Sequence, residues 1–179
     1  LPQQRGNPLS HAISTIFQMN PLVYFSHKGS GIIKPQDLVG KTIHVNFKKD
    51  IVFQALIKKL GISPNQLKTV HGTGINSFLN GKVDVYGGFL INEVLIAQAN
   101  GLELNLIFPD DYGIHFYSDT LFTTDEVIKA NPNLVLRFTR ATLSGLRWAI
   151  ENPLEASQLV QQYNPEANLT HQLAQMKSS

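Results

Sequence analysis

Between residues 41 and 108, the sequence alternates short β-type segments with short helical segments. Gly61, Gly81 and Gly101 each follow a helical segment, in the position where glycine commonly ends a helix. Strict alternation with connections of a few residues predicts βαβ units and a mostly parallel sheet covered by helices on both faces. We therefore assign residues 32–115 to one complete, Rossmann-like α/β lobe. The predicted strands are 41–47, 67–70, 83–86 and 104–108, and the predicted helices are 51–60, 75–80 and 92–100.

The flanking segments follow a different pattern. Apolar strands are predicted at 11–17, 22–26 and 116–122, and these strands need another sheet to join. Beyond them the chain turns helical. Thr123 and Glu126 fit a capping box, the longest predicted helix covers 133–150, and the pairs Asn152-Pro153 and Asn164-Pro165 each separate one helix from the next. Residues 1–31 and 116–179 are thus predicted to form a second, incomplete lobe with a helical carboxyl-terminal part.

Composition excludes several classes of function. Fifteen basic and thirteen acidic residues leave a formal charge of +2, and the basic residues are scattered, so no nucleic-acid footprint is visible. Without cysteine, the sequence has no disulfide framework, thiolate nucleophile or cysteine-based zinc site. The six histidines never stand at the i, i+4 spacing of a helical metal pair, and no G-x-S-x-G nucleophile turn occurs. We expect neither metal nor cofactor, and no catalysis.

Ligands of open parallel sheets bind beyond the carboxyl ends of the strands, where loops and helix N-termini present free backbone donors. In this sequence the rule selects three loops, at 46–50, 71–77 and 86–93. Polar residues and glycines in these loops are the candidate ligand contacts. They are Asn46, Lys48, Asp50, Gly72, Gly74, Asn76, Tyr86, Asn92 and Glu93.

Each loop also has a purely structural interpretation. Asp50 fits an N-cap of the helix that follows, and Glu93 fits an acidic residue at a helix start. The Gly72-Thr73-Gly74 stretch superficially suggests a dinucleotide fingerprint, but it lacks the third glycine and the acidic residue that follows. A tight turn, or a small polar group resting on its backbone amides, is therefore favoured there.

Four motifs resemble one protein family. Residues 31–43 are similar to the "GI-x-x-P-x-DL-x-GK-x-I" segment at the start of the second lobe of type II periplasmic solute-binding proteins. Residues 79–85 are similar to their "L-x-G-x-VD-x" segment, Asn92-Glu93 to the "NE" that follows, and residues 111–113 to the "DYG" of the NMT1/THI5-like branch. The order of the four motifs agrees with that of the family, and the resemblance covers nearly the whole chain. Through the last motif, Tyr112 joins the candidate ligand residues.

The resemblance implies two lobes joined by crossing strands, with a small molecule closed between them. It implies a noncatalytic module that captures a nitrogenous solute, such as a thiamin pyrimidine precursor, in the periplasm or another extracytoplasmic place. The partner would be the permease of an ABC importer. The alternative is an extracytoplasmic ligand-sensing domain attached to a histidine kinase or diguanylate cyclase.

Two departures from the family pattern carry further expectations. Some tens of residues that the family places before Leu1, and helix beyond Ser179, are absent, which suggests a domain cut from a longer protein whose exposed strand edges self-associate. The pyrimidine-synthesising enzymes of this branch carry a cysteine-rich iron-binding stretch. Since this sequence has no cysteine, enzyme activity of that type is not expected.

Overall fold

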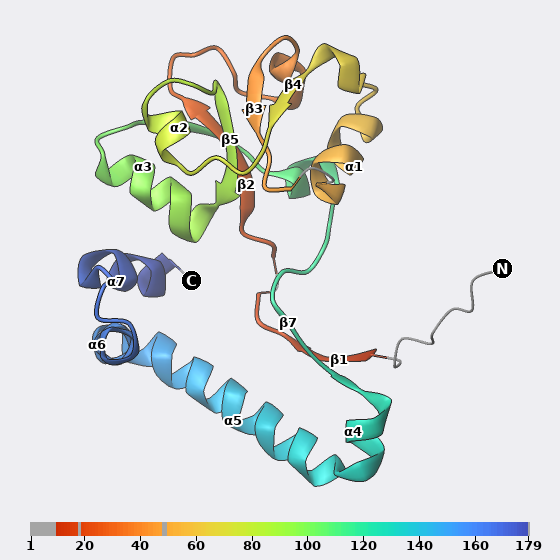
Figure 1. Cartoon of the computed structure of the whole chain (residues 1–179), viewed down its shortest axis with the longest axis vertical. Coiled ribbons are helices and arrows are strands. Elements are labelled where there is room, and N and C mark those ends of the chain that lie inside the picture. Colours follow the sequence, from red (N-terminus) through yellow and green to blue (C-terminus); the bar gives the residue numbers. More distant parts are fainter. Residues whose placement is uncertain (1–9, 18, 48–49, 179) are drawn as a thin grey trace, which may run out of the picture. The chain divides into compact units, whose positions relative to one another are not determined.

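The computed structural model describes residues 10–17, 19–47 and 50–178 (Figure 1). The chain divides into two compact units. One comprises Asn20–Phe116, and the other comprises Tyr117–Lys177 together with the described residues up to Met19.

The first unit contains a five-stranded sheet in the order β4-β3-β5-β2-β6. In it β3 is parallel to both β4 and β5, whereas β2 is antiparallel to both β5 and β6. Four strands therefore run in one direction, as the alternating pattern predicts, and β2 alone runs in the other. The strands are β2 (Leu22–His27), β3 (Thr42–His44), β4 (Lys68–Val70), β5 (Val85–Phe89) and β6 (Leu104–Ile107).

The position of β2 corrects one prediction. The expectation that residues 22–26 join a different sheet from residues 41–47 is wrong, because β2 lies between β5 and β6 in the same sheet as β3. The physical reason is visible in the burial of the strand: Leu22 and the next four residues are all buried. A strand that is buried on both faces belongs in the interior of a sheet. The division into lobes at residues 31 and 116 stays a prediction.

Short helices connect these strands. Helix α1 (Ile51–Lys59) begins at Asp50, whose side chain accepts a hydrogen bond of 3.0 Å from the Phe53 amide. Asp50 is therefore the N-cap that the sequence suggested. Helix α2 (Asn76–Leu79) follows β4, and a π-helical segment η3 (Leu90–Val94) leads into α3 (Leu95–Ala99). Three 3₁₀ turns complete the unit: η1 (Pro35–Leu38), η2 (Pro64–Gln66) and η4 (Pro109–Tyr112).

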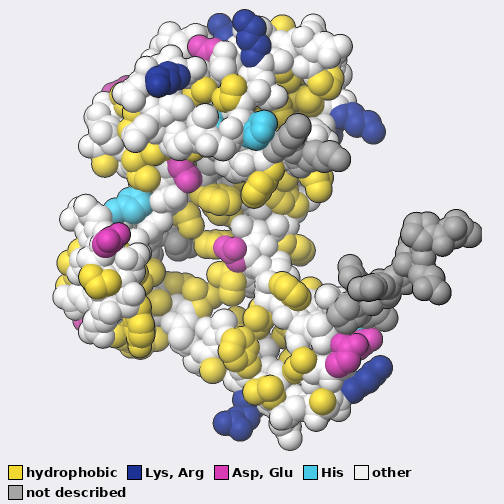
Figure 2. Space-filling model, viewed as in Figure 1, with side chains coloured by type: hydrophobic (Ala, Val, Ile, Leu, Met, Phe, Trp, Pro, Cys, Tyr) yellow, Lys and Arg dark blue, Asp and Glu magenta, His cyan; other side chains and the backbone are white. Residues whose placement is uncertain are grey.

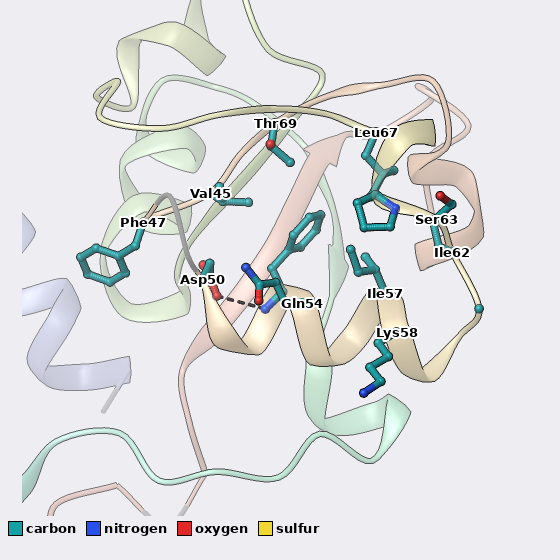
Figure 3. A pocket seen from close by; sticks show the side chains of 13 residues that line it. Val45, Phe47, Asp50, Gln54, Ile57, Lys58, Ile62, Ser63, Leu67 and Thr69 are labelled. Carbon is teal, nitrogen blue, oxygen red and sulfur yellow. Dashed lines mark hydrogen bonds between the residues drawn. The ribbon is translucent and has the colours of Figure 1, made fainter. Parts of the chain in front are cut away.

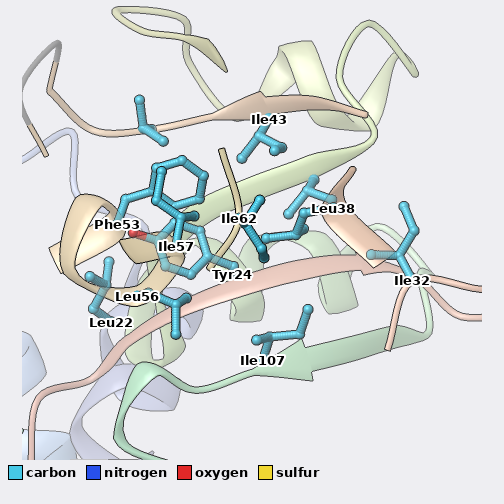
Figure 4. Close-up of a cluster of buried hydrophobic side chains, with 12 residues drawn as sticks. Leu22, Tyr24, Ile32, Leu38, Ile43, Phe53, Leu56, Ile57, Ile62 and Ile107 are labelled. Carbon is cyan, nitrogen blue, oxygen red and sulfur yellow. The ribbon is translucent and has the colours of Figure 1, made fainter. Parts of the chain in front are cut away.

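Two hydrophobic clusters cover the two faces of the sheet. Since successive side chains of a strand point to opposite faces, Tyr24 of β2 joins one cluster and Phe25 joins the other. The first cluster packs the sheet against α1 (Figure 4), with Ile43, Phe53, Leu56 and Ile107 among its members. The second packs it against α2 and α3, with Phe78, Tyr86, Val94 and Ala97. Coverage on both faces confirms the predicted layering.

The second unit consists of a two-stranded antiparallel sheet and helices. Strand β1 (Ser10–Thr15) pairs with β7 (Thr120–Thr124). Hydrophobic side chains remain on the surface of this unit (Figure 2), among them Leu134, Phe138 and Ile150 of α5. Within the described residues, no helix has the length and apolar character needed to cross a membrane. The helices are α4 (Asp125–Ala130), α5 (Pro132–Glu151), α6 (Pro153–Tyr163) and α7 (Leu169–Ser178).

Three local predictions for this unit are corrected. The strand expected at 116–122 begins at Thr120. Helix α4 starts one residue later than the capping box requires, so Thr124 rather than Thr123 is its cap, and its hydroxyl accepts from the Val127 amide. Pro165 does not start a helix, because a turn follows Asn164 and α7 begins only at Leu169.

Candidate functional site

Two aromatic rings meet where β3 ends and β5 begins: His44 is the last residue of β3, and Tyr86 is the second residue of β5. These strands are parallel neighbours, and their register places His44 beside Tyr86. The two rings stack with centroids 4.0 Å apart and planes inclined by 10°. His44 is only 4% exposed, and the sequence analysis missed it, because a histidine within a β-branched strand gives no sign of its partner on another strand.

The environment of His44 favours the neutral imidazole. Burial lowers the pKa of His44, and His71 acts in the same direction, whereas the Gly87 carbonyl and the carboxylates of Glu93 and Asp50 raise it. The net shift is downward. Because Nδ1 of His44 lies 3.3 Å from the Gly87 carbonyl oxygen, the neutral ring carries its proton on Nδ1 and donates it there.

Tyr86 connects β5 with the loop between β4 and α2. Its hydroxyl donates a hydrogen bond of 3.2 Å to the Thr73 carbonyl oxygen. Burial, and after it the charge of Glu93, raises the pKa of Tyr86, so the phenol stays protonated. The loop that accepts this bond contains Gly72, whose φ of +70° lies in the region that glycine adopts without strain.

The carboxylate of Glu93 is held in the turn after β5. Its Oε2 accepts a hydrogen bond of 2.8 Å from the Phe89 amide, and its Oε1 accepts one of 2.9 Å from Nδ2 of Asn92. A Cβ on Gly88 would lie 2.9 Å from the Glu93 Cβ, so glycine there makes room for this side chain. Glu93 thus has the helix-start role that the sequence allowed. A carboxylate has about four acceptor positions, which leaves capacity for a donor from a ligand.

The other predicted ligand residues have fewer contacts with this group of side chains. Asn46 is half-buried just after β3, Gly74 lies in open space in the loop before α2, and Asn76 is the exposed first residue of α2. Lys48 lies outside the described residues. Tyr112 of η4 packs against the cluster beneath α1, and burial, followed by Asp111 and Asp37, raises its pKa. Among the predicted residues, the structure brings Tyr86, Asn92 and Glu93 together with His44, while a role for Tyr112 stays a prediction.

A groove of about 540 Å³ lies beside α1 (Figure 3). Among the described residues, Asp50 is the one predicted ligand residue on its wall, and its carboxylate is already engaged with the first turn of α1. The other side chains that line the groove are mostly apolar, and none comes from residues 71–93. We therefore locate the candidate site at the strand ends rather than in this groove. The residues that line the groove beside α1 are Val45, Phe47, Asp50, Phe53, Gln54, Ile57, Lys58, Gly61, Ile62, Ser63, Pro64, Leu67 and Thr69.

Metal binding finds no support in the part of the chain that the structure describes. It contains no group of three or more histidine, cysteine, aspartate or glutamate side chains that could hold an ion. The strand-end group offers one carboxylate, a neutral imidazole, a phenol and backbone carbonyls. Most of these groups accept hydrogen bonds, which suits a ligand that donates them.

The family model described as NMT1/THI5 like matches residues 1–156. The chain belongs to the NMT1/THI5-like family. This match confirms the resemblance in the motifs at 31–43, 79–85, 92–93 and 111–113.

Three curated relatives are similar to the chain. The riboflavin-binding protein RibY of Chloroflexus aurantiacus is 30% identical over 94% of this chain and 49% of its own length. A formylaminopyrimidine-binding protein of Halalkalibacterium halodurans is 27% identical over 75% of this chain and 42% of its own. A 4-amino-5-hydroxymethyl-2-methylpyrimidine phosphate synthase of Legionella pneumophila is 29% identical over 90% of this chain and 53% of its own length. The chain therefore spans about half the length of these relatives.

Solved structures support the fold. The putative periplasmic sulfonate-binding protein SsuA of Methylobacillus flagellatus superposes with a TM-score of 0.59 at 16% identity, over 86% of this chain and 48% of that one. At this identity the likeness shows the fold alone. The chain has the α/β fold of type II periplasmic binding proteins, as the sequence predicted.

Proposed function

We propose that the chain is the ligand-binding part of a noncatalytic solute-binding protein that serves an ABC importer in an extracytoplasmic compartment. The proposed solute is a small nitrogen heterocycle that donates hydrogen bonds, such as an aminopyrimidine or a flavin. The ligand contacts are Tyr86, Asn92 and Glu93, with the loop of Gly72, Gly74 and Asn76 beside them.

The observation that carries this proposal is the held carboxylate of Glu93. Its two hydrogen bonds fix its position at the carboxyl end of β5, and Tyr86 lies within its electrostatic influence. A fixed carboxylate next to an aromatic ring suits an amino or ring N–H group on a flat heterocycle, because such hydrogen bonds are charge-assisted. At Gly72 and Gly74 an added Cβ would meet nothing within 4 Å, so these two glycines allow close approach of a ligand to the backbone.

The names of the relatives support the same class of solute. Two of them are named as binding proteins, for riboflavin and for formylaminopyrimidine, and both of those molecules are nitrogen heterocycles. A third is named as a pyrimidine phosphate synthase, so catalysis is the competing proposal. Binding is favoured over catalysis because the strand-end group lacks a nucleophile placed against a general base.

Calorimetric titration tests the proposal directly. The panel contains riboflavin, formylaminopyrimidine, an aminopyrimidine and an alkanesulfonate. We expect one of the heterocycles to bind, and we expect Glu93→Gln to weaken its binding by roughly 1–3 kcal/mol, the usual effect of spoiling a hydrogen bond to a charged group. The matched control is Glu103→Gln, because Glu103 is exposed and its carboxylate pairs with Lys28 in another part of the unit.

Two results contradict the proposal. If Glu93→Gln binds a confirmed heterocycle as tightly as the parent protein does, the carboxylate serves only the helix start. If a heterocycle is instead converted, a product of changed mass appears on incubation with the protein, and the chain belongs to an enzyme. The full-length reading frame tests the importer against a sensor, since a sensor carries a membrane segment and a signalling domain.

A further inference from the structure

One buried ring, that of His44, lies against Tyr86 and Gly87 of β5. We propose that His44 is a positioning residue, that it holds the Tyr86 ring and the Gly87–Gly88 backbone in the arrangement that receives the solute, and that its protonation weakens binding. The inference rests on the proposed solute binding, but its first test does not require a ligand.

The direct contacts of His44 are with Tyr86 and Gly87, and these two residues connect it to other parts of the site. Its ring stacks on Tyr86, and its Nδ1 hydrogen bonds to the Gly87 carbonyl. Tyr86 in turn fixes the loop at Thr73 through its hydroxyl. The residue after Gly87 lies against Glu93, because a Cβ at Gly88 would come within 3.0 Å of the carboxylate Oε2. A movement of the His44 ring is therefore transmitted to the Tyr86 ring, to the Gly87–Gly88 backbone of β5 and to the carboxylate of Glu93.

The protonation state of His44 is linked to this arrangement. The ionisable groups that face it are Glu93 from η3, Asp50 from the start of α1, His71 from the loop after β4, and Tyr86 from β5. In the neutral form Nδ1 donates to Gly87 and Nε2 remains an acceptor. A second proton turns Nε2 into a donor and places a charge on a ring that is 4% exposed. Protonation thus removes an acceptor from a site that otherwise suits donors.

The first experiment follows His44 by NMR in the free protein. Imidazole nitrogen shifts report the tautomer, and a titration across about pH 5 to 8, where histidine changes its charge, reports the protonation step. We expect an Nδ1–H tautomer, and we expect the backbone amides of Gly87 and Gly88 to shift with the same midpoint as the ring. Amides that do not follow the ring overturn the positioning role, whether or not any solute binds.

The second experiment measures affinity for riboflavin and formylaminopyrimidine over the same pH range. Two variants separate the contributions of the ring. His44→Asn keeps a donor near the position of Nδ1 but cannot titrate, whereas His44→Phe keeps the stacking surface but loses the donor. We expect the parent affinity to fall at acidic pH, His44→Asn to bind with a flatter pH profile, and His44→Phe to bind roughly three- to tenfold more weakly at neutral pH.

The control is His27→Asn. His27 also stacks on an aromatic ring, Phe78 at 4.5 Å, but it lies on β2 and is absent from the strand-end group. We expect this variant to keep both the affinity and the pH profile of the parent. If His44→Asn retains the parent pH profile, or if His44→Phe binds as tightly as the parent, the proposal is wrong. If none of the three heterocycles of the titration panel binds the parent protein, the proposed function fails instead, while the NMR titration still decides whether His44 positions the Gly87–Gly88 backbone.

Discussion

Gly87 is the position where a single added methyl group tests the packing beneath the site most sharply. Gly87 lies opposite Tyr24 in the antiparallel pair of β5 and β2. A Cβ built on it would lie 2.8 Å from Tyr24 Cε1, 3.1 Å from Tyr24 Cδ1 and 3.1 Å from the His44 carbonyl oxygen. Carbon atoms in good contact are about 3.5–4.0 Å apart, so the Gly87→Ala methyl overlaps a ring and a backbone atom together.

The ring cannot move aside without disturbing the core. Tyr24 is fully buried, and its ring packs against Phe53 with centroids 5.2 Å apart. Overpacking of a well-packed core lowers the free energy of unfolding by about 1–3 kcal/mol. Because one contact is shorter by about 0.7 Å than the lower limit for carbon atoms and the ring is confined, we expect a loss near 2 kcal/mol.

Urea unfolding followed by circular dichroism measures this loss. With a slope of about 1–3 kcal/mol per molar urea, the midpoint should fall by roughly 1 M. The matched control is Gly74→Ala, because a Cβ on Gly74 meets nothing within 4 Å and its φ is not in the left-handed region. An unchanged midpoint in Gly87→Ala would show that Tyr24 and β5 relax freely, and the argument from close packing would then be wrong.

Three further predictions concern the same unit. Asp50→Ala removes the N-cap of α1 and should lower the free energy of unfolding by about 1 kcal/mol in a urea titration, and Asp50→Asn, which keeps a capping oxygen, should recover most of it. Among the described residues Tyr24 is the one whose buried hydroxyl has no hydrogen-bond partner, so Tyr24→Phe should leave thermal stability unchanged or raise it; a clear loss would reveal an unseen partner. Because the pKa of His44 is lowered by burial, the unfolded chain takes up this proton first as the pH falls, so stability should decline below about pH 6.5 and His44→Asn should flatten that decline in thermal melts at several pH values.

The sequence was sufficient for the layers of the fold and insufficient for its strand order. Local signals located α1, because Asp50 and Gly61 mark its two ends, and the longest predicted helix, 133–150, agrees with α5 to within one residue at each end. Strand order depends instead on pairings between distant residues. The strand β2 looked separate from the alternating segment because no helix connects it to β3, yet its continuous burial suits only an interior position.

The sequence likewise predicted some residues of the candidate site and missed others. The rule of strand carboxyl ends selected Glu93, which follows β5. It selected Tyr86 only because the predicted strand ended at residue 86, whereas β5 begins at Val85 and continues to Phe89. It could not select His44, whose ring is buried rather than exposed in a loop. It also selected Asn76 and Lys48 on position alone, and the first of these is exposed at the start of α2 while the second lies outside the described residues.

The register of β3 against β5 is what makes the site. His44 and Tyr86 are 42 residues apart, and they meet because Ile43 pairs with Val85 one step earlier in the ladder. Both of those side chains are fully buried, and a slip of one residue would exchange the faces on which all four side chains lie. The hydrophobic core therefore fixes the register, and the register in turn fixes the stacked pair. For this reason a core substitution such as Ile43→Thr should disturb the His44 resonances even though residue 43 lies on the opposite face of the sheet.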